Sequence, residues 1–165
     1  MPKQKKYYFD IDGSTNFELV KIAVNNGIKL KINDIMMMNM LSKIKLKKNM
    51  NLILNLADLH AGGGSHWVLF LIRDKKALYI DSFGCKVSQE VYDFCLKYNL
   101  QLGYSNYICQ ELNSSRCGIY CIQALKYLQK CNSNNLYSKG NEYVNMYEPL
   151  KENKNEKICI SGLLL

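Results

Sequence analysis

The sequence predicts an α+β domain in which helices flank a central mixed β-sheet. Three observations support this prediction. The length of 165 residues corresponds to one domain. The hydrophobic content of 48% is sufficient for an ordinary core. Helical and strand patterns follow each other in the order helix, strands, helix, strand, helix, which is typical of helices packed on a mixed sheet.

The first part of the chain predicts a helix followed by sheet strands. Residues 14–26 are predicted to be helical, with Ser14 as the cap and Gly27 after the end; the expected apolar side consists of Phe17, Val20, Ile22 and Val24. Residues 35–41 are apolar and rich in methionine, and their pattern does not separate helix from strand. Residues 51–56 are predicted to form a buried strand, before a glycine-rich loop at 61–65.

The central part of the chain predicts a β-hairpin and two further helices. Residues 66–72 and 76–81 have strand patterns, and residues 73–75 form the turn between them. Residues 88–98 are predicted to be helical because apolar residues recur at i, i+3, i+4 and i+7. Residues 102–109 are predicted to form another strand. A long helix is expected over about 116–130, capped by Ser115.

The composition changes after Asn132, where Asn, Ser, Lys and Glu dominate. We therefore expect residues 1–131 to form the folded domain and residues 132–165 to form a polar C-terminal tail or arm that packs poorly. The first residues lack the apolar stretch of a secretory signal, and no apolar run approaches the length that spans a bilayer. We expect a protein that is not secreted, does not enter membranes and stays in a reducing compartment.

The chain is basic, with 22 Lys and Arg against 14 Asp and Glu and a net charge of +8. Such a surface favours polyanions through counterion release, without reading a base sequence. The densest basic stretch supplies the candidate DNA-binding residues Lys43, Lys45, Lys47 and Lys48. The alternative is a solvated lysine-rich surface that reflects an AT-rich coding sequence.

Cysteine usage gives little support for a metal site. The chain has 7 cysteines and 2 histidines but no C-x-x-C motif. A structural zinc site therefore lacks suitable spacing, and no metal is expected. Most of these cysteines are interpreted as small buried hydrophobic residues.

Four residues stand where they could carry out nucleophilic catalysis. Cys117 lies in the first turn of the long helix, where N–H groups and the helix dipole favour a thiolate, and Gly118 is expected to leave open space beside it. His66, at the start of a strand, could act as base and acid, and Asp81 could orient its ring. Gln110 could donate an N–H to an oxyanion, together with the Cys117 amide.

Each of these residues also has an ordinary structural explanation. Cys117 could be a buried helical cysteine like Cys121, and His66 could be a strand histidine held in a turn. Asp81 could be a turn residue and Gln110 a polar loop residue. His60 is a rival base, on the other side of the glycine loop.

The order of these residues resembles a known enzyme family. The runs GSHW at 64–67, YIDSFG at 79–84 and QELNSSRCGIYC at 110–121 are similar to those of adenovirus-type cysteine proteases (adenain), whose wider relatives are the SUMO-deconjugating proteases. The family has His, Asp or Glu, Gln and Cys in this order, and the Gln-to-Cys spacing of 7 resembles the adenain branch. The run NLAD at 55–58 resembles proteases of virophages and Polinton-like elements, although those relatives often carry an acid in place of Ala57. Coverage runs from about residue 14 to 130.

The resemblance implies a thiol endopeptidase with the adenain and SUMO protease fold, in which His66, Asp81 and Cys117 form the triad and Gln110 supplies the oxyanion hole. It also implies that substrates are viral capsid or other structural precursors, cleaved after small residues such as glycine during virion maturation. The expected location is the virion and the host cytoplasm or virus factory. DNA is an activating cofactor in the adenovirus relatives. The candidate substrate-binding residues are Gly63, Gly64, Ser65 and Trp67, the last of which is expected to narrow the cleft.

Three other functions remain open at this point. A deconjugating protease for a ubiquitin-like modifier would use the same chemistry on a different partner, but the chain has no obvious large insertion to grip a folded modifier. A basic, DNA-binding virion protein could retain the fold without activity, although all four catalytic residue types are present. An acetyltransferase of the same clan is more distant, because nothing suggests a coenzyme A site.

Overall fold

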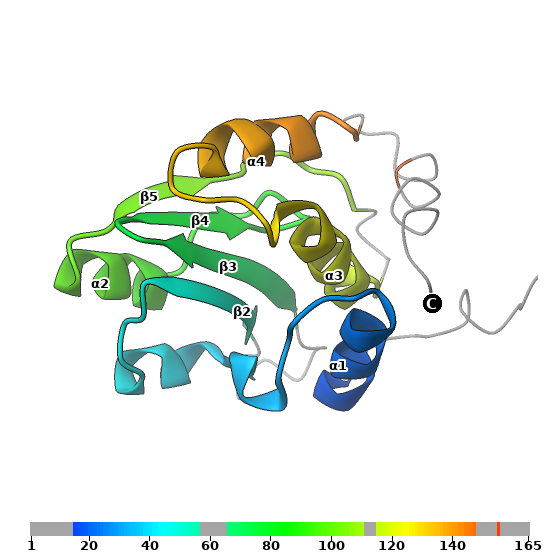
Figure 1. Cartoon of the computed structure of the whole chain (residues 1–165), viewed down its shortest axis with the longest axis horizontal. Helices are drawn as coiled ribbons and strands as arrows, with labels where there is room; N and C mark the ends of the chain where they lie inside the picture. Colours follow the sequence, from blue (N-terminus) through cyan, green and yellow to red (C-terminus); the bar gives the residue numbers. More distant parts are fainter. Residues whose placement is uncertain (1–14, 57–65, 111–114, 148–154, 156–165) are drawn as a thin grey trace, which may run out of the picture.

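The computed structural model describes residues 15–56, 66–110, 115–147 and 155. It confirms an α+β architecture with a mixed sheet flanked by helices (Figure 1). The sheet has 5 strands in the order β1-β2-β3-β4-β5, which are Ile35–Met37, Asn49–Asn55, Trp67–Arg73, Lys76–Ile80 and Gln101–Tyr104. The outer pairs, β1 with β2 and β4 with β5, are parallel, whereas β2 with β3 and β3 with β4 are antiparallel.

The hairpin of β3 and β4 brings two segments of the candidate site to one end of the sheet. Leu69 pairs with Ile80, so the residues before β3 and after β4 lie at the same end of the hairpin. The turn at the other end contains Asp74 with φ of 56°, a left-handed conformation that Asp tolerates better than most residues. The predicted hairpin is therefore confirmed, with His66 just before β3 and Asp81 just after β4.

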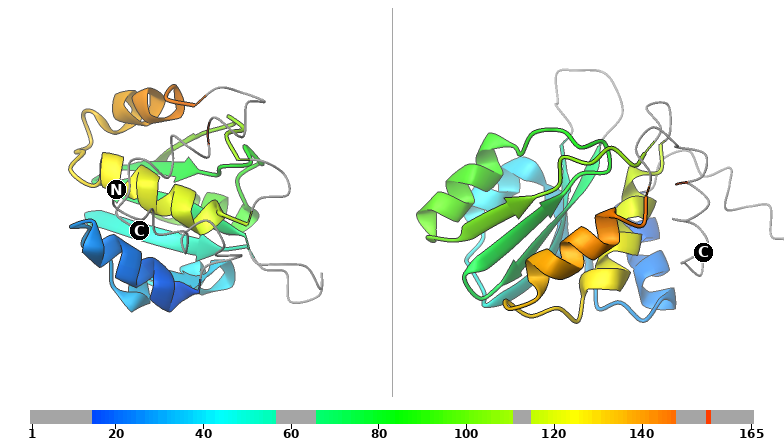
Figure 2. Two further views of the ribbon diagram at one scale, coloured as in Figure 1. Left: turned by 90° about the vertical axis from the view of Figure 1, so that its right-hand side faces the viewer. Right: turned by 90° about the horizontal axis from the view of Figure 1, so that it is seen from above.

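Helices cover both faces of the sheet (Figure 2). One face packs against α1 (Asn16–Asn25), α3 (Cys117–Leu128) and α4 (Leu136–Val144). The other packs against α2 (Gln89–Lys97) and the 3-10 segment η3 (Met38–Lys43). A short 3-10 turn, η2 (Ile32–Asp34), precedes β1. Because side chains alternate along a strand, β3 contributes Leu69 and Leu71 to the first core and Phe70 and Ile72 to the second. No helix in the described ranges combines the length and apolar character needed to cross a membrane.

The cap of α1 lies next to the predicted one. Thr15 is the N-cap, and its hydroxyl accepts from the amide of Glu18 at 3.2 Å. The Glu18 carboxylate in turn accepts from the Thr15 amide at 2.7 Å, which completes a capping box. Ser14, the predicted cap, lies outside the described residues.

The predicted apolar face of α1 is wrong at two positions. Phe17 is 73% exposed and Val24 is 61% exposed. Ile22 is buried as predicted, and the other buried residues are Leu19 and Ala23; the three recur at helical spacing. The prediction weighted residue type over periodicity and therefore selected residues from more than one face.

The ambiguous segment at 35–41 contains both kinds of structure, because β1 leads directly into η3. The predicted helix at 88–98 is confirmed as α2, with Ser88 accepting from the Val91 amide as its cap. The strand predicted at 102–109 ends earlier, at Tyr104. Its continuation leaves β5 and bonds to the region after β4, where the Cys109 amide donates to the Ser82 carbonyl at 2.9 Å.

The long helix is confirmed as α3, but its N-cap is Arg116 rather than Ser115. It is the most deeply buried helix described, with 10 of its 12 residues buried. This burial follows from its position between the sheet, α1 and α4. Cys117 is the first residue of the helix.

The expectation of a poorly packed tail is wrong for the described residues after 132. They form α4, in which Leu136 and Tyr143 are buried, and the chain continues to a buried Tyr147. The Tyr143 hydroxyl donates to the carbonyl of Tyr120 in α3 at 3.3 Å. A polar average composition conceals these buried residues, because the three of them, 7 and 4 positions apart, stand among polar ones. The rest of the predicted tail, 148–154 and 156–165, lies outside the described residues.

Candidate active site

The side chains of His66 and Asp81 form the centre of the candidate site. His66 Nε2 lies 2.7 Å from Asp81 Oδ1, and Asp81 is fully buried. The amide of Phe83 donates to the same carboxylate oxygen at 2.8 Å and holds it in place. Because an ionised carboxylate can only accept, the proton of the neutral ring lies on Nε2, and Nδ1 presents its lone pair.

The turn after β4 packs against the His66–Asp81 pair. The ring of Phe83 packs against that of His66, with centroids 4.8 Å apart. The Gly84 amide donates to the Asp81 carbonyl at 2.9 Å, and Gly84 has φ of 63°. A Cβ at Gly84 would lie 2.8 Å from the carbonyl oxygen of Asn106. A glycine is required here for conformation and for space, so that the turn can pack against the segment after β5.

Cys117 joins this pair from α3. Its Sγ accepts from the backbone amide of Trp67 at 3.4 Å, which places the thiol beside the residue that follows His66. The positive end of the α3 dipole lies at the same position. The helix N-terminus and the Trp67 amide therefore both favour a negative charge on sulfur.

Gly118 does not leave the open space expected beside Cys117. A Cβ at this position would lie 2.7 Å from Leu19 Cδ2 and 3.3 Å from Trp67 Cδ1. The absence of a side chain instead allows α1, α3 and the start of β3 to pack closely.

The electrostatic environment favours a protonated His66. Burial alone lowers the pKa of the imidazole, but its interactions with Asp81 and Cys117, and the negative charges of both groups, raise it more. The pKa rises from 6.5 to about 9. Nδ1 is buried, and no described residue forms a hydrogen bond with it that meets ordinary distance and angle limits. At neutral pH the site therefore favours an imidazolium between a carboxylate and the Cys117 sulfur.

Gln110 is attached to the same turn through Ser82. The Ser82 hydroxyl donates to Gln110 Oε1 at 2.5 Å, and the Gln110 amide donates to the Ser82 carbonyl at 3.0 Å. The adjacent Cys109 carbonyl accepts from the hydroxyl of Tyr120 in α3 at 3.2 Å. Fully buried Gln110 is thus held between the residue after Asp81 and the helix that begins with Cys117.

The structure therefore brings His66, Asp81 and Cys117 together and links Gln110 to them. Trp67 lies beside Cys117 through its backbone, while its side chain is mostly buried between the sheet, α1 and α3. The predicted substrate-binding residues Gly63, Gly64 and Ser65, and the rival base His60, lie outside the described residues.

The four candidate DNA-binding residues, Lys43, Lys45, Lys47 and Lys48, are exposed. The Lys48 carbonyl accepts from the amide of Asp74, in the turn between β3 and β4, at 2.6 Å. This turn lies at the opposite end of β3 from His66, about 20 Å away at the usual rise per strand residue. The end of the basic stretch is therefore remote from the candidate site.

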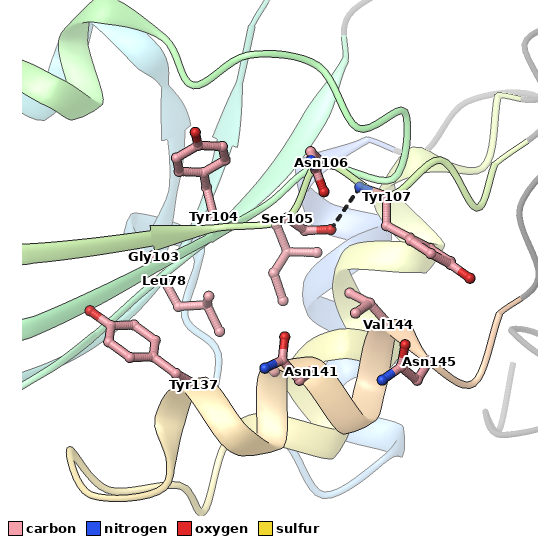
Figure 3. A pocket seen from close by; sticks show the side chains of 12 residues that line it. Leu78, Gly103, Tyr104, Ser105, Asn106, Tyr107, Tyr137, Asn141, Val144 and Asn145 are labelled. Atoms are coloured by element: carbon pink, nitrogen blue, oxygen red, sulfur yellow. Dashed lines mark hydrogen bonds between the residues drawn. The ribbon is translucent and has the colours of Figure 1, made fainter.

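A separate cavity of about 300 Å³ lies between the end of β5 and α4 (Figure 3). Tyr104 and Tyr107 border it on one side, and Tyr137, Asn141 and Asn145 on the other. None of the four candidate catalytic residues lines it. The cavity is therefore distinct from the His66–Asp81–Cys117 cluster.

Neither a protein-family model nor a curated protein sequence matches the chain. Across the described ranges, no group of three or more His, Cys, Asp or Glu side chains is arranged to hold a metal ion.

Sequence reasoning missed the roles of two residues next to Asp81. Ser82 bonds Gln110, and Phe83 contacts both Asp81 and His66. Both lie in the YIDSFG run that carries part of the family resemblance. Their contacts depend on tertiary structure, so no local pattern distinguishes them from ordinary turn residues.

Proposed function

We propose that this protein is a thiol endopeptidase of the adenain type. The observation that carries the proposal is the position of His66, which is bonded to buried Asp81 through Nε2 and is raised in pKa by both Asp81 and Cys117. A nucleophile, a base and a group that orients the base are the minimum set for acyl transfer through a covalent intermediate.

In the proposed mechanism, His66 Nδ1 holds the proton of the Cys117 thiol before substrate reacts, so the resting site is a thiolate–imidazolium pair. The sulfur attacks the scissile carbonyl carbon, and the carbonyl π electrons move to oxygen. The Gln110 side-chain NH2 and the Cys117 amide are the proposed donors to this oxyanion. As the oxyanion collapses, the C–N bond breaks and the imidazolium gives its proton to the leaving amine.

Deacylation reverses these roles with water as the nucleophile. His66 Nδ1 takes a proton from water, and the resulting hydroxide attacks the thioester carbon. The C–S bond then breaks, the acid product leaves and the Cys117 thiolate is regenerated. Asp81 keeps the ring in one orientation through both steps, because it accepts the Nε2 proton throughout.

By resemblance, we propose that the substrates are viral capsid or other structural precursors, cleaved after small residues such as glycine during virion maturation. The proposed place of action is the virion or the virus factory in the host cytoplasm. No observation on the described residues favours a ubiquitin-like modifier as substrate. A ubiquitin-like aldehyde probe distinguishes that alternative, because only a deconjugating enzyme would react with it efficiently.

The test is an unbiased search for cleavage sites. The purified protein is incubated with a denatured proteome, and new N-termini are identified by mass spectrometry. We expect cleavage after small residues by the wild type and none by Cys117→Ala or His66→Ala. Cys121→Ala, one helical turn further along α3, and His60→Ala serve as controls that retain activity. Equal fragments from wild type and Cys117→Ala would overturn the proposal, as would their absence from both.

A further inference from the structure

We propose that Ser82 is a positioning residue that fixes the side-chain amide of Gln110 in the orientation required for an oxyanion donor. This inference rests on the proposed function and assigns a task that the triad does not perform. Ser82 is buried, and its hydroxyl donates to Gln110 Oε1 at 2.5 Å. It acts through Gln110 and not on the substrate.

The orientation of a glutamine amide decides whether it helps or hinders catalysis. Its nitrogen can donate to a developing oxyanion, whereas its oxygen would repel one. The two ends have similar size, so packing alone does not select between them. In the structure the Ser82 hydroxyl donates to Oε1, and this bond holds the oxygen on the side of Ser82 and turns the NH2 away from it.

The backbone around Ser82 makes the contact rigid. The Ser82 carbonyl accepts from the amides of both Cys109 and Gln110, at 2.9 and 3.0 Å. Ser82 thus holds Gln110 by its main chain and by its side chain. The Cys109 carbonyl is anchored to α3 by the Tyr120 hydroxyl, which prevents the segment from moving away from the helix that carries Cys117.

Adjacent residues therefore divide two tasks. Asp81 bonds His66 and controls the proton affinity of the base. Ser82 bonds Gln110 and controls the direction of the oxyanion donor. Loss of the Ser82 hydroxyl should consequently lower kcat with little change in KM, and should leave the pH dependence set by His66 unchanged.

The experiment is a double-mutant cycle on kcat and KM, using a peptide that the wild type cleaves. We expect Gln110→Ala to lower kcat on the order of 10²–10³-fold and Ser82→Ala roughly 10–100-fold. In the Gln110→Ala background, Ser82→Ala should cost nothing further, because no amide remains to be oriented. Ser82→Thr, which keeps the hydroxyl, should restore activity. Ser105→Ala is the matched control: the Ser105 hydroxyl accepts from the Tyr107 amide, away from Gln110, and its loss should leave kcat unchanged.

An equal loss from Ser82→Ala in both backgrounds, a loss confined to KM, or no loss at all would overturn the positioning role. Should Ser82→Ala fail to fold, the double-mutant cycle is repeated with Ser82→Cys, which nearly keeps the side-chain volume but is a weaker hydrogen-bond donor. A wild type without Cys117-dependent cleavage would overturn the proposed function itself. An active wild type with an additive cycle overturns only the role of Ser82.

Discussion

His66 Nε2 and Asp81 Oδ1 lie 2.7 Å apart at the end of the β3–β4 hairpin, and Asp81 has no exposure to solvent. Burial alone would lower the pKa of His66, yet the pKa is raised to about 9. The hydrogen bond and negative charge of Asp81 are the largest part of the opposing effect. The buried carboxylate of Asp81, together with Cys117, therefore extends the pH range in which the imidazolium exists.

Replacing Asp81 with Asn should shift the alkaline limit of activity to lower pH. The active ion pair needs a protonated His66, so activity should fall as the pH rises through the pKa of about 9. Without the negative charge, burial lowers the pKa of His66. The alkaline limit of activity should therefore move to lower pH by roughly 1–3 units. The maximal kcat should also fall steeply, because an amide no longer selects the Nε2–H tautomer. The measurement is kcat/KM of a cleaved peptide between pH 6 and 10.

The control for this experiment is Asp74→Asn, which removes the same charge from an exposed position in the β3–β4 turn. Its pH profile should match the wild type. An unchanged alkaline limb in Asp81→Asn would show that Asp81 does not govern the protonation of His66.

Alkylation by iodoacetamide at mildly acidic pH should modify Cys117 first. Protonated His66 and the helix N-terminus favour its thiolate, whereas burial and the charge of Asp81 raise the pKa of Cys85. Burial also raises the pKa of Cys95 to about 11. Rates per residue are measured by peptide mapping. In His66→Ala, alkylation of Cys117 should be slower and alkylation of Cys85 unchanged. If exposed Cys85 were labelled faster than Cys117 in the wild type, an activated Cys117 would be contradicted.

Arg73, at the end of β3, is a buried structural cation. It is 4% exposed, and its donors all bond neutral acceptors that connect β2, β3 and the end of α3. These acceptors are the carbonyls of Met50, Ile72, Gln129 and Cys131 and the side-chain oxygen of Asn51. The positive charge also faces the negative end of the α3 dipole.

Arg73→Met should therefore lower the free energy of unfolding by roughly 2–4 kcal/mol, since it leaves several buried acceptors unsatisfied. Arg73→Lys should be intermediate, because an ammonium has fewer donors. Denaturant unfolding measures both, and Lys75→Met, in the neighbouring exposed turn, should change stability little. If the Arg73 and Lys75 variants were equally stable, the proposed structural role of Arg73 would be contradicted.

We further propose that duplex DNA activates the protein through Lys43, Lys45, Lys47 and Lys48. Because Lys48 lies at the far end of β3 from His66, DNA bound there would act without touching the reacting atoms. Peptide cleavage should rise with DNA at low salt, and this gain should fade as salt increases. It should weaken when these four lysines become glutamines.

The matched control replaces four exposed lysines elsewhere, Lys21, Lys29, Lys97 and Lys130, with glutamine. This variant has the same net charge as the first and should retain activation. An equal loss in both variants would assign the effect to net charge alone. An unchanged cleavage rate while DNA is bound would reject DNA as an activator.

Local patterns in the sequence predicted the central hairpin well. The strands around Asp74 alternate with a clear turn between them, and the ends of that hairpin place His66 near Asp81 without further information. Cys117 was predicted at a helix N-terminus because α3 has a long apolar pattern.

Local patterns could not predict contacts between segments that are distant in the sequence. Ser82 and Gln110 are 28 positions apart, and neither residue is unusual in its own neighbourhood. The packing of α4 was missed because a few buried residues, among them Tyr143, sit in a polar stretch. Phe17 is the opposite case. It is apolar and was predicted to be buried, but it lies on the exposed face of α1.

The most direct test of the central claim is covalent trapping of the nucleophile. A peptide that the protein cleaves is prepared with a vinyl sulfone in place of the scissile carbonyl, and the modified protein is analysed by intact mass and peptide mapping. We predict attachment of one equivalent to Cys117, loss of peptide cleavage in proportion to labelling, and no reaction in His66→Ala. Attachment to another cysteine, or full cleavage by protein whose Cys117 is completely modified, would contradict the assignment of Cys117 as the nucleophile of a thiol endopeptidase.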